Sequence, residues 1–254
     1  MRFRLTALIV GFPGLLDTVA GCSHPTQPPV VAPTAHPAHP AHPAHPDHHA
    51  GHHFQDAAHW AAEFDAPERL AWQKPDDVIQ LMAIAPGERV ADLGAGTGYF
   101  LPYLSRAVGP GGKVLALDVE PAMVDHMRKR VAREQLANVE PRLVSGNDPS
   151  LPAESFDKIL IVDTWHHLGD RVAYARKLAA ALAGCRTSPA SVTVVDFVAD
   201  SPFGPPPEMR LAPQVVADEL RAAGLAPQLR AETLPYQYVI VATKPSQAEC
   251  SAHR

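Results

Sequence analysis

Cysteine is scarce in this 254-residue chain, which contains only Cys22, Cys185 and Cys250. Cys185 and Cys250 could pair in an oxidising compartment or remain free thiols, and the sequence favours neither. An excess of one charge is also absent, since 22 Lys and Arg stand against 27 Asp and Glu, which argues against nucleic-acid binding. The chain has no internal apolar run long enough for a transmembrane helix.

The first residues resemble the targeting segment of a bacterial lipoprotein. Arg2 and Arg4 give a positive start, and Leu5–Leu16 is apolar but too short to span a bilayer comfortably. The sequence Val-Ala-Gly-Cys ends at Cys22, as in a lipobox, where cleavage precedes a cysteine that receives lipid. This resemblance predicts a signal peptide over residues 1–21 and a lipid (palmitate) anchor in the cell envelope, in the outer membrane if the cell is Gram-negative. Without processing, the protein would be cytoplasmic.

Residues 22–53 form a low-complexity linker rich in proline and histidine. Ala-His-Pro occurs four times in succession from Ala35 to Pro46, and proline at every third position favours polyproline II. The hydrophobic content is too low to form a core. Two interpretations stay open: a semi-rigid tether, or a weak metal site made of neutral imidazoles. The candidate metal ligands are His36, His39, His42, His45, His48, His49, His52 and His53.

The segment Val90–Phe100 is the most informative part of the chain. A short apolar run ends at Asp92 and is followed by three alternating glycines. Such glycines let a strand turn sharply into a helix and leave bare backbone against which a ligand can lie. A second apolar run ends at Asp118, where an acid at the tip of the next strand would accept hydrogen bonds from ribose hydroxyls. The pattern predicts a nucleoside-binding α/β unit.

The glycine spacing indicates which nucleoside. The chain reads G-x-G-x-G, with Tyr99 where the dinucleotide fingerprint G-x-G-x-x-G continues. Asp92, just ahead of the loop, would repel a phosphate but could hold an ammonium group. The predicted ligand therefore has a ribose and an amino-acid end and no phosphate, which fits S-adenosylmethionine.

At these residues the chain resembles the class I S-adenosylmethionine-dependent methyltransferases. The resemblance covers about residues 85–245. It implies an α/β, Rossmann-like sheet of seven mostly parallel strands in the order 3-2-1-4-5-7-6, with helices on both faces. It also implies S-adenosylmethionine as cofactor and a small-molecule methyl acceptor. We expect the methyltransferase domain to extend over residues 54–245, with a flexible tail over 246–254. The implied cofactor-binding residues are Asp92, Gly94, Ala95, Gly96, Gly98, Asp118, Val119, Asn147, Asp148 and Asp163.

The alternation of apolar runs and helical patterns predicts the same class of fold, because βα units build a parallel sheet. A closing pair of strands without a helix between them suggests a hairpin. The expected strands are 89–93, 113–118, 139–144, 156–163, 191–198, 227–232 and 236–243. The expected helices are 56–64, 67–84 with a break near Lys74-Pro75, 99–108, 121–135, 168–183 and 211–224.

The loop after the fourth strand carries the candidate catalytic residues, His166 and His167. Methyl transfer is an in-line displacement that needs alignment and no metal, and a base is needed only if the acceptor loses a proton. An imidazole can act as that base near neutral pH, although each histidine can equally be structural. Asp163 could orient an imidazole or contact the ligand.

Several subclasses of methyltransferase are disfavoured. The loop lacks the Asp-Pro-Pro-Tyr pattern of DNA adenine enzymes, and the chain lacks a cysteine cluster for arsenite or a carboxylate set for Mg²⁺. What remains is loosely similar to the ubiquinone and menaquinone C-methyltransferases. Gly204–Arg210 and Trp72–Pro75 are candidate covers of the acceptor and the cofactor, and both could equally be surface packing.

One conflict leaves a second hypothesis open. S-adenosylmethionine is made in the cytoplasm, whereas a lipidated Cys22 implies export. The alternative is a non-catalytic, membrane-anchored lipoprotein that binds a nucleoside or a metal and keeps a methyltransferase fold. The enzyme hypothesis is favoured because the glycine loop, Asp92 and Asp118 are all present.

Overall fold

The computed structural model describes residues 56–184, 188–230 and 234–244. The predicted signal peptide, the histidine tract and all three cysteines lie outside these ranges, so the expectations about them remain predictions. Within these ranges, none of the helices has the length and apolar character needed to cross a membrane.

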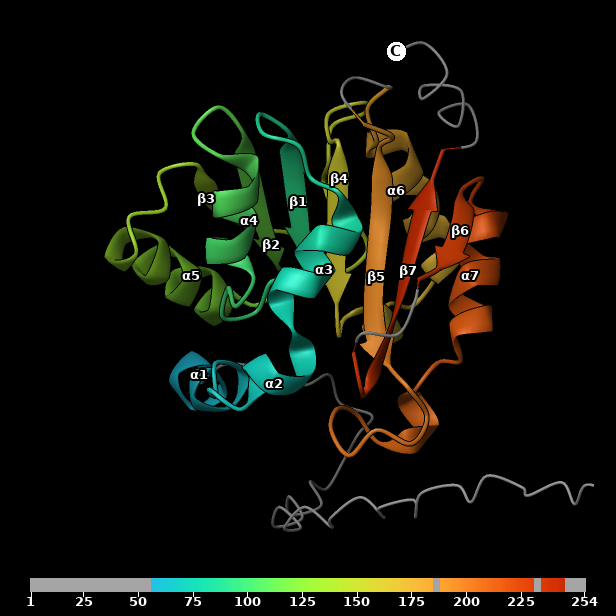
Figure 1. The fold of residues 1–254 in the computed structure, drawn as a ribbon, viewed down its shortest axis with the longest axis horizontal. Helices are drawn as coiled ribbons and strands as arrows, with labels where there is room; N and C mark the ends of the chain where they lie inside the picture. The colour runs from blue at the N-terminus through green and yellow to red at the C-terminus, as the bar shows by residue number, and fades with distance from the viewer. Residues whose placement is uncertain (1–55, 185–187, 231–233, 245–254) are drawn as a thin grey trace, which may run out of the picture. The chain divides into compact units, whose positions relative to one another are not determined.

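One seven-stranded sheet organises the described residues (Figure 1). Its strand order is β3-β2-β1-β4-β5-β7-β6, with β1 to β5 mutually parallel and β7 antiparallel to both β5 and β6. The predicted order and closing hairpin are confirmed. The strands are β1 (Arg89–Leu93), β2 (Lys113–Asp118), β3 (Val139–Leu143), β4 (Lys158–Val162), β5 (Ser191–Phe197), β6 (Ala226–Leu229) and β7 (Gln237–Thr243).

Helices cover both faces of the sheet, and each face has its own apolar core. On one face, residues such as Leu104 and Met127 of α4 and α5 pack with Val78 of α3. On the other face, Leu178 of α6 and Leu220 of α7 pack against the sheet. The helices are α1 (Ala57–Phe64), α2 (Arg69–Gln73), α3 (Pro75–Met82), α4 (Leu101–Val108), α5 (Pro121–Arg133), α6 (Arg171–Ala181) and α7 (Pro213–Ala222), with 3-10 turns η1 (Trp165–His167) and η2 (Pro207–Met209).

Local chemistry explains where these helices begin and end. Lys74 has a left-handed conformation (φ 44°) between α2 and α3, since the proline after it disfavours the right-handed helical region. The predicted break is therefore confirmed. The sequence pattern placed the start of α6 too early, at residue 168. Asp170 instead caps this helix by accepting a hydrogen bond from the Ala173 amide (3.0 Å), and the histidines lie in the separate turn η1.

The parallel strands bring the predicted functional residues to one edge of the sheet. The fully buried strand β4 lies between β1 and β5, so the loops after all three strands are neighbours. Figure 1 shows α1 and α2 at this same end, where the arrow of β5 stops. The candidate site is built between this sheet edge and these two helices.

Candidate cofactor and acceptor site

The glycine loop turns away from β1 directly above the neighbouring strand. The amides of Gly94 and Ala95 both donate to the Leu117 carbonyl (2.8 and 3.0 Å). Gly94 has φ +68°, and a Cβ there would collide with the side chain of Thr164. Gly96 has φ +55°, but a Cβ on it would meet only Phe64, 3.9 Å away. Gly94 is therefore required by packing, and the open side of Gly96 faces the end of α1.

Asp118 lies at the tip of β2, close against this loop. One carboxylate oxygen accepts from the Gly96 amide (2.8 Å) and the other from the Glu120 amide (2.9 Å). Burial raises the pKa of Asp118 even though these backbone hydrogen bonds lower it. Each oxygen retains a second lone pair that a ribose hydroxyl can use. The two hydrogen bonds thus fix the position of the Asp118 carboxylate at the end of β2.

Two apolar side chains are exposed beside Asp118. Val119, which follows it, is 50% exposed, and Leu143 at the end of β3 is 48% exposed. Leu143 is the register partner of Asp118, so the two side chains belong to adjoining strand ends. Exposed apolar side chains at neighbouring strand ends are suited to contact a flat heterocycle such as adenine.

Asp92, at the end of β1, is a buried carboxylate. Burial raises its pKa to about 7, and repulsion from Asp118 adds to the rise, whereas Arg69 opposes it. A desolvated acid next to a second acid gains from any cation that enters. This environment matches the predicted role of Asp92 as a partner for an ammonium group.

The third predicted loop is more exposed. Asn147 and Asp148 follow β3 and are open to solvent. Lys177 donates from Nζ to the Asn147 carbonyl (2.7 Å) and lies 3.7 Å from the Asp148 carboxylate. Asp148 also accepts from the Ser150 amide (2.9 Å). The predicted contact with an adenine amino group stays a prediction.

Asp163 belongs to a ring of polar side chains that the sequence alone does not indicate. It accepts hydrogen bonds from Gln237 Nε2 and from Arg69 Nη2 (3.4 Å). Gln73 closes the ring, because its amide donates to Gln237 Oε1 (2.6 Å) and its oxygen accepts from Arg69 (2.8 Å). Burial raises the pKa of Asp163 to about 7, although Arg69 lowers it. The ring joins α2 to the ends of β4 and β7.

A second set of contacts ties the same helical segment to the glycine loop. Asp65, which follows α1, accepts from the Thr97 hydroxyl (3.0 Å) and from Arg130 Nη1 of α5 (3.0 Å). The segment from α1 to α2 is therefore held at two points, over the glycine loop and over β4. The expectation that Trp72–Pro75 covers the site agrees with this position, but its cover of a bound cofactor stays a prediction.

His166 is paired with Asp196 at the end of β5. Its Nδ1 lies 2.9 and 3.0 Å from the two carboxylate oxygens, and the side chains are only 2% and 1% exposed. Asp196 also accepts from the Phe197 amide (2.9 Å), which fixes the carboxylate. Of the two roles that the sequence left open for Asp163, orienting the imidazole falls to Asp196 instead, and a contact of Asp163 with the ligand stays a prediction. His167 is exposed, and its ring centre lies 4.2 Å from that of His166.

An aromatic cluster links α2 to the loop after β5. Trp72 stacks on Phe203 (5.0 Å between centres, 12°) and lies 6.1 Å from Phe197. Tyr236 contacts Phe203 edge-on (5.3 Å). Arg210 fixes the loop by donating to the backbone carbonyls of Ala199, Ser201, Phe203 and Pro205. Trp72, in the first expected cover segment, therefore contacts Phe203, the residue directly before the second one.

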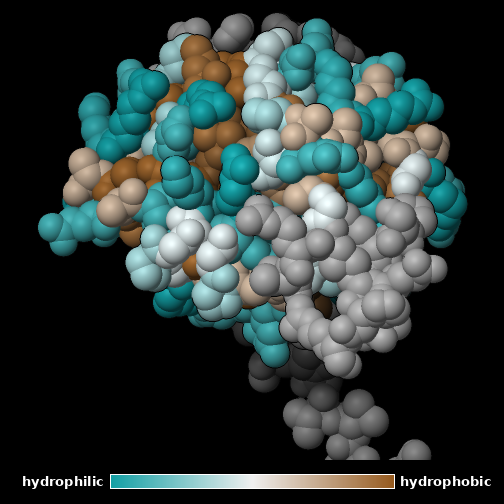
Figure 2. Space-filling model, turned by 90° about the horizontal axis from the view of Figure 1, so that it is seen from above, coloured by the Kyte–Doolittle hydropathy of each residue, from teal (hydrophilic) through white to brown (hydrophobic). Residues whose placement is uncertain are grey.

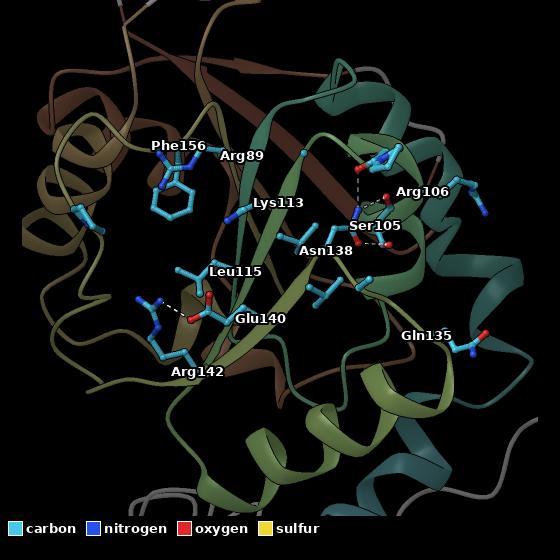
Figure 3. Close-up of a pocket in the computed structure, with 17 residues that line it drawn as sticks. Arg89, Ser105, Arg106, Lys113, Leu115, Gln135, Asn138, Glu140, Arg142 and Phe156 are labelled. Atoms are coloured by element: carbon cyan, nitrogen blue, oxygen red, sulfur yellow. Dashed lines mark hydrogen bonds and ion pairs between the residues drawn. The ribbon is translucent and has the colours of Figure 1, made fainter.

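A cavity at the opposite end of the sheet holds none of the predicted site residues. It lies at the amino ends of β1 to β3 and is lined by Arg89, Lys113, Asn138, Phe156 and Arg142, which pairs with Glu140 (Figure 3). Seen from this end, hydrophilic side chains cover much of the visible face, with hydrophobic patches between them (Figure 2). In open α/β sheets ligands bind at the carboxyl ends of the strands, so we assign the site to the glycine-loop edge.

Comparison with known proteins shows the family of this chain. Residues 90–184 match the methyltransferase-domain family. A solved S-adenosylmethionine-dependent methyltransferase from Aquifex aeolicus is 30% identical, with a TM-score of 0.67 over 74% of this chain and 97% of that one. The chain belongs to the S-adenosylmethionine-dependent methyltransferases. The fold class and the cofactor predicted from the glycine loop are thereby confirmed.

Two curated relatives of this methyltransferase act on small molecules according to their names. Aklanonic acid methyltransferase DauC of Streptomyces sp. strain C5 is 32% identical over 56% of this chain and 64% of its own length. Demethylmenaquinone methyltransferase of Geobacillus sp. strain WCH70 is 33% identical over 36% of this chain and 38% of its own length. The chain thus spans less than two thirds of the curated relatives that it matches.

The residues of this methyltransferase fit its cofactor. S-adenosylmethionine carries a sulfonium, an ammonium and one carboxylate, so it enters as a net cation. Asp92 is a buried acid with a raised pKa, Gly96 leaves open backbone, and Asp118 has spare lone pairs. Asp92 would hold the amino-acid end of the cofactor and Asp118 its ribose, and the cofactor would lie against the open backbone at Gly96. When bound, the cofactor supplies a methyl group activated by positive sulfur.

Proposed function

We propose that this methyltransferase acts on a small organic molecule whose acceptor atom loses a proton, with His166 as the base. The buried pair of His166 and Asp196 carries the proposal. The names of the two curated relatives support a small-molecule acceptor.

The geometry of the pair favours a base at Nε2 of His166. Because Nδ1 lies within 3.0 Å of both Asp196 oxygens, it carries the proton and donates it to the carboxylate. That tautomer leaves the lone pair on Nε2. When Nε2 takes a proton, the carboxylate stabilises the imidazolium that forms. Asp196 is therefore a positioning residue, and His166 is the proton acceptor.

In the proposed step, this pair receives the proton that the acceptor atom loses. The acceptor atom gives its proton to His166 Nε2 and forms the new bond to the methyl carbon, while the carbon–sulfur bond breaks and its electrons remain on sulfur. The proton then leaves His166 for solvent. Asp163, Gln73 and Gln237 contribute by holding α2 against the strand ends, which fixes the relative positions of the two ligands.

The acceptor class can be tested with cofactor labelled in its methyl group. Full-length protein is incubated with this cofactor and with separate extracts of low-mass metabolites, proteins, RNA and DNA. Label is expected in the low-mass fraction, and a panel of phenols and carbon acids then narrows the acceptor. Label in a macromolecular fraction alone, or in none, would contradict the proposal. Heat-denatured protein serves as the blank.

We also propose that the protein is anchored by lipid at Cys22. The lipobox-like Val-Ala-Gly-Cys sequence after an apolar stretch supports this placement. Mass spectrometry of the native protein should find a mature N-terminus at Cys22 with an acyl modification, and Cys22→Ser should release the protein from membranes. An intact Met1 in the soluble cytoplasmic fraction of wild-type cells would refute it.

A further inference from the structure

Arg69 is a largely buried cation beside the glycine loop, with a side chain that is 12% exposed. Its guanidinium lies 4.3 Å from the centre of the Tyr99 ring and 5.6 Å from that of Trp72. Burial lowers its pKa, while Asp163, Asp65 and Asp92 act to raise it. The group is thus positioned among the acids that border the candidate cofactor site.

The hydrogen bonds of Arg69 leave part of its guanidinium available. A guanidinium has five N–H donors. Nε donates to Gln73 (3.2 Å), Nη2 donates to Gln73 (2.8 Å) and at longer range to Asp163 (3.4 Å), and Nη1 donates to the Phe64 carbonyl (3.0 Å). Among the described residues these bonds use four donors, and the second hydrogen of Nη1 remains.

Tyr99, which follows the last glycine of the loop, offers a second donor beside Arg69. Its hydroxyl is buried and has no hydrogen-bond partner in the part of the chain that the structure describes. Burial raises the pKa of Tyr99 to about 12, so the hydroxyl keeps its proton at neutral pH. A buried donor without a partner costs free energy, and a ligand acceptor would remove that cost.

We infer that Arg69 and the Tyr99 hydroxyl bind the carboxylate of the amino-acid end of the cofactor. This inference uses the cofactor of the family and does not depend on the proposed acceptor or on His166 as the base. The amino-acid end is a zwitterion, and the site offers matching groups: Asp92 for the ammonium, and a guanidinium and a phenol for the carboxylate. Arg69 thereby has two functions, because its bonds to Gln73 and Asp163 also hold α2 in place.

Calorimetric binding of two ligands distinguishes carboxylate recognition from a purely structural role. The ligands are S-adenosylhomocysteine and its decarboxylated analogue, which keeps the adenosine, the thioether and the amine. Tyr99→Phe removes only the hydroxyl and keeps the ring under Arg69. Arg69→Met removes the charge and keeps the stem. Tyr174→Phe, a similarly buried tyrosine on α6 at the other face of the sheet, is the matched control.

We expect Tyr99→Phe to lower the affinity for S-adenosylhomocysteine about 10-fold and Arg69→Met to lower it about 100-fold, as for lost hydrogen bonds to a charged group. Tyr99→Phe should change the affinity for the decarboxylated analogue less than about threefold, and Tyr174→Phe should change neither affinity. Arg69→Met also frees α2 and removes a charge beside Asp92, so it should weaken binding of the analogue too, but less than binding of S-adenosylhomocysteine. Equal losses for both ligands, or no loss in Tyr99→Phe, would overturn the inference and leave the cofactor assignment intact. Failure of the wild-type protein to bind either ligand would overturn both.

Discussion

Replacing His166 with Gln should lower kcat by about 10²- to 10⁴-fold while cofactor affinity stays within about twofold of wild type. The glutamine cannot take a proton, but it keeps a polar group of similar size next to Asp196. The imidazole is 2% exposed and bound through Nδ1, so its loss removes the proton acceptor without opening the glycine loop. The measurement is steady-state turnover of the acceptor found with labelled cofactor.

Two further variants separate the roles of the pair. Asp196→Asn should also lower kcat, by about 10²-fold, because an amide no longer stabilises the imidazolium and can favour the wrong tautomer. His167→Gln is the matched control and should stay within about threefold of wild type, since His167 is exposed. Circular dichroism checks that each variant is folded. A folded His166→Gln enzyme that retains wild-type turnover would show that alignment alone carries the rate.

The affinity for S-adenosylhomocysteine should fall about tenfold for each pH unit below about 7, and level off above about 8. Asp92 causes this dependence, because burial and then Asp118 raise its pKa to about 7. The ligand ammonium binds the ionised carboxylate, so a proton on Asp92 competes with the ligand. Calorimetric titrations between pH 5 and 8 measure the slope.

Variants identify the group responsible for this slope. Asp92→Asn should bind S-adenosylhomocysteine weakly at every pH, and its affinity should depend little on pH. Asp163→Asn is the matched control, because burial also raises the pKa of Asp163 to about 7 but its carboxylate is paired with Gln237 and Arg69. This variant should keep the slope. A slope that persists in Asp92→Asn would assign the titration to another group.

The ligand-free protein should show the opposite trend in stability. A carboxyl group whose folded pKa lies above its unfolded value, ordinarily about 3.9, binds its proton more tightly in the folded state. The contribution of Asp92 to stability is therefore complete below that unfolded pKa and is lost as the pH rises through about 7. Ligand binding should restore stability most strongly at the higher pH.

The sequence predicted the central part of the fold because local signals agree there. The bounds of β1 and β2 were predicted correctly, since each is a short apolar run ended by an acid and a turn. The loop after β3 lacks a comparable signal, and Asn147 and Asp148 lie exposed on it. The roles assigned to individual cofactor-binding residues remain predictions.

The polar partners could not be predicted, because strand register brings them together. His166 and Asp196 are neighbours because β4 and β5 pair with Val162 opposite Val195, so both residues follow paired positions. The ring through Arg69 depends on the antiparallel placement of β7, which brings Gln237 to Gln73 from 164 positions away. No local pattern in the sequence predicts a contact between residues so far apart.

The central claim is that the cofactor binds at the glycine loop with its ribose on Asp118. The most direct measurement is calorimetric titration of S-adenosylhomocysteine into full-length wild-type protein and the Asp118→Asn variant at pH 8. Asp125→Asn, which changes an exposed acid on α5 paired with Arg128, is the matched control. We predict saturable binding with one site per chain, a loss of about 5- to 100-fold in Asp118→Asn, and no change in Asp125→Asn. Folded wild-type protein that binds no ligand, or an Asp118→Asn variant that binds like wild type, would contradict the account.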